Sequence, residues 1–167
     1  MIAVLVDDLA FLDVDAVLRP ANEVLEPVTP AMTRLDERAG AAFQDQRRVQ
    51  FPFDAGAAVV TGAGNLVARF VVHVVVQSRR TDPGPDVIRR GLISAWQRAS
   101  DWELATVAAP LIGSGAGQLP PEEAATLLAE TFREHRARAR FPESLSIVLE
   151  READRTAVEA AIARFQS

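Results

Sequence analysis

A glycine-rich segment between an apolar run and a helical pattern is the part of this sequence best suited to bind a ligand. The apolar run of residues 104–112 leads into Gly113, Ser114, Gly115, Ala116 and Gly117, and a proline pair then opens the helical pattern. Glycines let main-chain N–H groups approach a ligand closely, and the helix N-terminus adds partial positive charge. This arrangement is typical of phosphate sites. The alternative is a tight strand-to-helix turn without a ligand.

Composition predicts one globular domain over residues 1–167, because 49% of the residues are hydrophobic and 25% are charged. The chain has no cysteine and two histidines, His73 and His135. Disulfides and thiolate catalysis are therefore excluded, and little remains to hold zinc. We expect no cofactor and no metal.

The charge balance argues against nucleic acid as a partner. The formal net charge is −5, so long-range electrostatics would repel a phosphate backbone, and a bound phosphate must be held locally by amides. No apolar stretch approaches the roughly 18 residues that span a membrane, and no basic segment precedes the first apolar run. We expect a cytoplasmic protein without membrane contact.

Hydrophobic patterning predicts an α/β layered sheet of about six strands and four helices. Strands are expected at 2–6, 14–18, 57–61, 70–76, within 104–112, and at 144–150. Helices are expected at 29–46, 86–100, from 121 onward, and at 153–165. Ligands in such sheets bind at the carboxyl ends of strands, which is where Asn22, the turn at 62–65 and the loop 113–117 fall.

Three segments stand out together: Asp8 followed by Arg19-Pro20-Ala21-Asn22, residues 56–75 (GAAVVTGAGNLVARFVVHVV), and residues 110–120. In this order they resemble the macro domain family, whose members bind ADP-ribose and related nucleotides. The first segment matches the family's aspartate and, at the family's spacing, its Asn-Ala-Ala-Asn tetrad. The second resembles another family motif, and the third resembles the family's phosphate loop. The resemblance implies a three-layer α/β/α macro-domain-like fold with a mixed six-stranded sheet.

The resemblance also implies roles for individual residues. Asp8 matches the aspartate that accepts a hydrogen bond from the adenine amino group, with Leu9 beside it, although a solvated turn would also explain an aspartate here. The loop from Gly113 to Gly117 matches the amides that wrap the diphosphate. Asn22 matches the asparagine near the distal ribose and is the one catalytic candidate; its alternative is a turn asparagine.

Departures from the family pattern concentrate around the distal ribose. The family's glycine run is replaced by Val28-Thr29-Pro30, and Gly117 stands where an aromatic residue is common. Arg19 replaces the first asparagine of the tetrad, and we expect its side chain to reach solvent. Elsewhere we expect His73, Trp96 and Trp102 in the core and His135 at the surface.

The sequence therefore predicts binding of ADP-ribose or a related adenine nucleotide diphosphate without strong catalysis. The partner would be the free small molecule or an ADP-ribosylated protein, and the oligomeric state is left open. One alternative is an ADP-ribose-processing hydrolase that uses Asn22. Another is a degenerate macro scaffold that no longer binds nucleotide.

Overall fold

The computed structural model describes residues 1–115 and 118–166. Its strands are β1 (Ile2–Val6), β2 (Ala16–Asn22), β3 (Ala58–Gly62), β4 (Phe70–Gln77), β5 (Thr106–Ala109) and β6 (Ser144–Leu149). The α-helices are α1 (Pro30–Ala39), α2 (Ala41–Gln46), α3 (Pro85–Asp101), α4 (Pro121–Arg136) and α5 (Arg155–Ile162), and short 3-10 turns lie at Leu9–Phe11, Glu152–Asp154 and Ala163–Phe165. None of the helices within this described part is long and apolar enough to cross a membrane.

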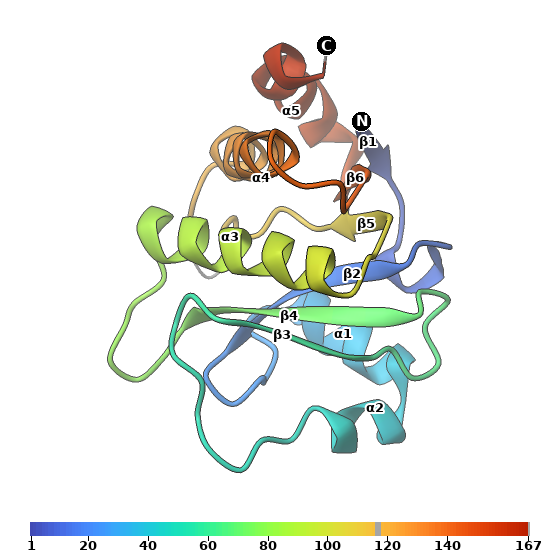
Figure 1. Cartoon of the computed structure of the whole chain (residues 1–167), viewed down its shortest axis with the longest axis vertical. Coiled ribbons are helices and arrows are strands. Elements are labelled where there is room, and N and C mark those ends of the chain that lie inside the picture. The colour runs from blue at the N-terminus through green and yellow to red at the C-terminus, as the bar shows by residue number, and fades with distance from the viewer. Residues whose placement is uncertain (116–117, 167) are drawn as a thin grey trace.

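The six strands form one mixed sheet in the order β1-β6-β5-β2-β4-β3, with only β3 antiparallel to its neighbour. Figure 1 shows α3 in front of the sheet and α1 behind it. The expected three-layer α/β/α fold is therefore confirmed. The strand β4 reads FVVHVVVQ and is buried along its centre, as a strand covered by helices on both faces requires.

Two predicted boundaries were wrong. β2 runs to Asn22 instead of ending at residue 18, because it pairs with β4 from Ala16 to Asn22. Its other neighbour, β5, pairs with it only at Ala16 and Val17, so Pro20 lies where a missing donor on that side is tolerated. The predicted helix 29–46 is split into α1 and α2 at Gly40, whose φ is +92°. That backbone angle suits glycine and interrupts the helix.

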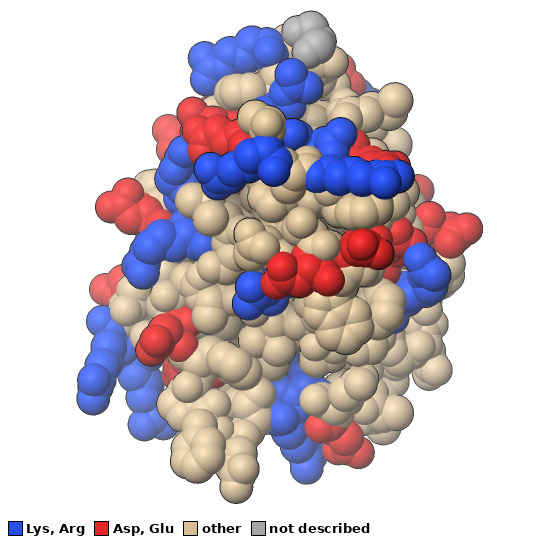
Figure 2. All heavy atoms as spheres, viewed as in Figure 1, with Lys and Arg blue, Asp and Glu red and all other residues tan. Residues whose placement is uncertain are grey.

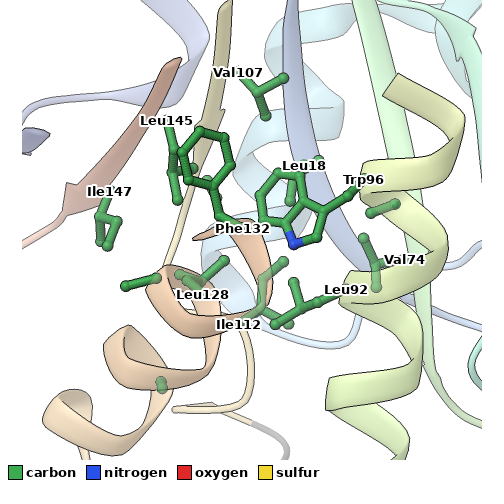
Figure 3. Packing of buried hydrophobic residues seen from close by; sticks show 14 of the residues in the cluster. Leu18, Val74, Leu92, Trp96, Val107, Ile112, Leu128, Phe132, Leu145 and Ile147 are labelled. Carbon is green, nitrogen blue, oxygen red and sulfur yellow. The ribbon is translucent and has the colours of Figure 1, made fainter. Parts of the chain in front are cut away.

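The larger core lies between the sheet and helices α3, α4 and α5. Trp96 and Phe132 meet edge to face at 5.5 Å between ring centroids, and Figure 3 shows them together at the centre of this cluster. The indole N–H of Trp96 donates to the hydroxyl of Thr131 at 2.9 Å. Trp102 does not share this position: it is 54% exposed and packs against Phe70, so its predicted core position was wrong.

His135 was also misplaced by the sequence analysis. It is buried, and its Nε2 lies 2.8 Å from the carbonyl oxygen of Phe141. Because a carbonyl only accepts, His135 donates this hydrogen bond. The arginines around it in sequence remain near the surface, and Figure 2 shows acidic and basic side chains interspersed on the face in view.

The prediction for Arg19 was wrong as well, since its side chain is fully buried. It projects from β2 toward α1 and forms two hydrogen bonds with the Asp36 carboxylate, from Nε at 2.8 Å and from the terminal nitrogen at 2.6 Å. Arg47 approaches the same carboxylate at 3.1 Å. A forked guanidinium–carboxylate contact of this kind fixes direction as well as distance. The buried pair therefore fixes α1 against the sheet.

His73 on β4 extends this network in the core, as predicted for it. The third nitrogen of Arg19 lies 3.0 Å from its Nδ1, and the Thr61 hydroxyl lies 2.8 Å from its Nε2. A guanidinium can only donate, so Nδ1 accepts and the ring is neutral with its proton on Nε2. That proton is donated to Thr61, which itself donates to the carbonyl of Gly62 at 2.9 Å.

Replacing Asp36 by asparagine should strongly destabilise the fold. It leaves Arg19 buried without its charge partner, a loss that costs about 3–5 kcal/mol for buried pairs. Asp45→Asn is the matched control, because Asp45 is 71% exposed and pairs only loosely with Arg48 at 3.6 Å; its cost should stay below about 1 kcal/mol. Urea unfolding measures both. Equal losses would contradict the assigned importance of the buried pair.

Acid should destabilise the protein through His73. Burial, followed by the positive charges of Arg19 and Arg47, holds the pKa of His73 well below its ordinary value of 6.5. Below about pH 6.5 the unfolded chain therefore takes up a proton that the native state does not, and the free energy of unfolding falls by up to about 1.4 kcal/mol per pH unit. NMR of the ring protons, assigned with a His135→Gln variant, should show a neutral His73 at pH 5.5. Native-state titration near 6.5 would contradict this.

Candidate functional site

A groove of about 1080 Å³ lies at the carboxyl ends of the parallel strands. Residues at or just beyond the ends of β1, β6, β5, β2 and β4 contribute to it, together with α1 and the loop before α4. The lining consists of Asp7, Asp8, Leu9, Pro20, Val28, Thr29, Pro30, Ala31, Met32, Arg34, Leu35, Arg38, Val76, Pro110, Leu111, Gly113, Ser114, Gly115, Pro121, Val148, Leu149, Glu150, Arg151 and Asp154. The strand ends thus form a crevice where such sheets bind ligands.

Most of the predicted site residues meet in this groove. Asp8, Leu9, Gly113, Ser114 and Gly115 all line it. The Asp8 side chain also begins the first 3-10 turn, since its Oδ1 accepts the amide of Ala10 at 2.9 Å. Asp8 is exposed, and within the described residues its Oδ2 has no hydrogen-bond partner. Ala116 and Gly117 lie outside the described residues.

Asn22 is the predicted residue that the structure does not bring to the groove lining. Its Oδ1 accepts the amides of Val24 at 3.0 Å and Glu26 at 2.9 Å. Its Nδ2 donates to the Glu26 carboxylate at 3.3 Å. These bonds close the turn after β2, which corresponds to the structural alternative for this asparagine.

The glycine loop presents unused main-chain donors. Gly113 has a φ of +101°, and its carbonyl accepts the amide of Leu119 at 2.9 Å. Within residues 1–115 and 118–166, the N–H groups of Gly113, Gly115 and Ala31 have no hydrogen-bond partner. All three residues line the groove. Unpaired amides of this kind, two in a glycine loop and one in the first turn of a helix, are suited to an anion.

The opposite wall is the first turn of α1. Thr29 caps this helix, with its hydroxyl accepting the amide of Met32 at 3.2 Å. A Cβ built on Gly115 would lie 2.5 Å from the Thr29 methyl group. The glycine loop and the start of α1 are therefore in contact, and only a residue without a side chain fits between them.

Charged lining residues on α1 and after β6 were missed by the sequence analysis. Arg34 and Arg38 lie four residues apart on one face of α1, and Glu150, Arg151 and Asp154 follow β6. Helical spacing could have paired the two arginines, but on sequence alone they are indistinguishable from a solvated helix face. Their place in the groove depends on the packing of α1. Among the described residues, no three His, Asp or Glu side chains gather as metal ligands would.

The chain belongs to the macro domain family, because the sequence model of the Macro domain matches residues 19–128. Among curated relatives, a Mycobacterium tuberculosis protein is 27% identical over 129 residues, which cover 77% of this chain and 36% of that protein. The chain thus spans about a third of the length of this mycobacterial relative.

Solved macrodomains share the fold. The Trypanosoma brucei macrodomain, solved in complex with ADP-ribose, superposes with a TM-score of 0.85 at 18% identity, covering 96% of this chain and 68% of that one. A point variant of the Oceanobacillus iheyensis macrodomain, solved with ADPR, gives a TM-score of 0.79 at 20% identity, covering 96% and 91% of the two chains. These likenesses establish the architecture independently of the sequence match.

Gly113→Ala should destabilise the loop. A Cβ at this position would lie 2.7 Å from Ile88 Cδ1 and 3.0 Å from Leu119 Cδ1, at a φ of +101°. Residues held at such angles cost about 1–3 kcal/mol. Gly84→Ala is the control, because its backbone is extended and a Cβ there meets nothing within 4 Å; its cost should stay under about 1 kcal/mol. Thermal unfolding compares them, and equal stabilities would refute the strain.

Proposed function

We propose that this chain binds ADP-ribose, or a closely related adenine nucleotide diphosphate, in the groove at the strand ends. The observation that carries the proposal is the pairing of an acidic acceptor, Asp8, with the unpartnered amides of Gly113, Gly115 and Ala31 in one groove. Its volume of about 1080 Å³ is slightly above the range of roughly 300–1,000 Å³ for small-molecule and cofactor sites.

Asp8 supports recognition of adenine. Its Oδ1 already accepts the amide of Ala10, and a carboxylate has acceptor sites to spare. The 6-amino group of adenine is a donor, whereas the corresponding oxygen of a hypoxanthine or guanine base is an acceptor. A carboxylate at this point therefore favours adenine over those bases.

The amides support recognition of the diphosphate. The chain carries a net charge of −5, so a diphosphate gains nothing from the overall field of the protein. Partial positive charge on N–H groups, reinforced by the N-terminus of α1, acts only at short range. Binding then depends on a close fit between the diphosphate and these amides. The contact between Gly115 and Thr29 keeps the glycine loop close to the start of α1.

The wall near the distal ribose is less well supplied with donors. Pro30 has no N–H, and Val28 brings a branched side chain where a glycine would admit close approach. We therefore propose binding without strong catalysis. The hydrolase alternative relies on Asn22, whose side chain is engaged in the turn with Glu26. Recognition of an ADP-ribosylated protein and a cytoplasmic location remain predictions from the sequence.

Calorimetric titration of ADP-ribose, with ADP and AMP beside it, tests the proposal together with Gly115→Val. Wild type should bind ADP-ribose in the micromolar range, and AMP, which lacks the diphosphate, should bind more weakly. Gly115→Val should abolish binding. A Cβ at this position would lie 2.5 Å from the Thr29 methyl group, so the valine would clash with the start of α1 and displace the loop.

Gly84→Val is the matched control, since this glycine has an extended backbone and free space around it. It should bind ADP-ribose like wild type. A bound ligand must also raise the melting temperature. If neither heat nor a melting shift appears with any of the three nucleotides, the proposed function is wrong and the scaffold alternative gains support.

A further inference from the structure

One ion pair joins two of the elements that line the groove, α1 and the segment after β6. The terminal nitrogen of Arg34 on α1 donates to the Glu150 carboxylate at 3.1 Å, and the side chains are 63% and 66% exposed. Both residues line the groove, and Glu150 directly follows β6. The two partners are 116 positions apart in the chain, so the contact exists only because α1 packs beside the end of β6.

The position of this pair within the groove follows from its neighbours. Glu150 comes directly after Leu149, whose carbonyl accepts the amide of Asp7 at 3.3 Å. The pair is thus attached to the strand ends that carry Asp7 and Asp8. Asp8 is the residue to which the proposed function assigns the adenine base, so the pair lies at the base end of the groove.

Stability gives little reason for this pair. Exposed ion pairs contribute about 1 kcal/mol or less, and many contribute nothing. We therefore look to binding, and not to stability, for the role of this exposed contact.

The groove also lacks the side chains that usually stack on a base. None of the described lining residues is aromatic. The lining residues with a planar side chain that could stack on a base are three arginines. Two of these already contact other side chains. Arg38 lies over the Phe11 ring at 5.0 Å, and Arg151 pairs with Asp154 three residues away. Of the three, Arg34 alone pairs with a groove residue on a different element, Glu150 after β6.

We propose that Arg34, anchored by Glu150, covers the adenine base and takes the place of an aromatic stacking residue. This inference rests on the proposed function. A guanidinium is planar, stacks on aromatic faces and remains charged, whereas a lysine ammonium is a point charge without a face. Glu150 acts as a positioning residue, because its carboxylate orients the guanidinium without contacting the base. The ion pair therefore persists when the nucleotide binds.

The decisive variant is Arg34→Lys, which keeps the charge and removes the plane. Loss of a stacking partner weakens base binding by about 10-fold or more. Arg34→Lys and Arg34→Met should therefore both raise the Kd for ADP-ribose by about 10-fold. Glu150→Gln should raise it by a smaller factor, because the guanidinium loses its charged anchor. Calorimetry measures all three, and melting temperatures without ligand should stay near the wild-type value.

Matched controls change an arginine and a glutamate that form ion pairs outside the groove. Arg48→Lys changes an arginine that is 80% exposed and paired with Asp45, and Glu143→Gln changes a glutamate paired with Arg140 at 3.7 Å. Neither residue lines the groove, and neither variant should alter the Kd.

The outcomes separate this inference from the proposed function. Wild-type affinity in Arg34→Lys with a loss only in Arg34→Met would show that charge matters and stacking does not. Tighter binding by Glu150→Gln would show that Glu150 competes with the ligand for Arg34. Either result overturns the base cover while leaving nucleotide binding intact. Failure of wild type to bind ADP-ribose overturns both.

Discussion

The buried ion pair between Arg19 and Asp36 is the interaction on which the site depends. Arg19 projects from β2, and Asp36 lies in the second turn of α1. Two charged groups inside a protein are tolerated only with close mutual bonding, so this contact permits one orientation of α1. The first turn of that helix forms one wall of the groove. The position of this first turn is thus determined by the Arg19–Asp36 contact, which lies further along the same helix.

The groove presents main-chain hydrogen-bond donors in a protein whose net charge is negative. Main-chain N–H groups hold an anion without adding net charge, and they act only on a ligand that fits. In a protein with a net charge of −5, this arrangement favours a small diphosphate ligand over a long polyanion. The contact between Thr29 and Gly115 narrows the same space. Compared with the family's glycine run, the segment Val28-Thr29-Pro30 thus gives this wall a different shape and fewer N–H donors.

Much of the architecture could be predicted because its causes are local. The apolar run of β4, the cap at Thr29 and the glycines of the loop each determine the conformation of their own segment. Asp8 and Gly113–Gly115 were placed by motif spacing, and both line the groove. Asn22 shared that motif, yet its amide closes a turn with Glu26. The choice between these two uses depends on the conformation of the following loop.

The sequence by itself determined the elements and the glycine loop, because hydrophobic period, capping and turn chemistry are read within a few residues. It indicated the family through the resemblance of three motifs. Only the tertiary structure decided the positions of Arg19, His135 and Trp102, and the pairing of Arg34 with Glu150. An arginine has the same local signature in solvent and in a buried ion pair. Its position is decided by the partner that folding brings to it, and Asp36 and Glu150 become partners only when α1 packs on the sheet.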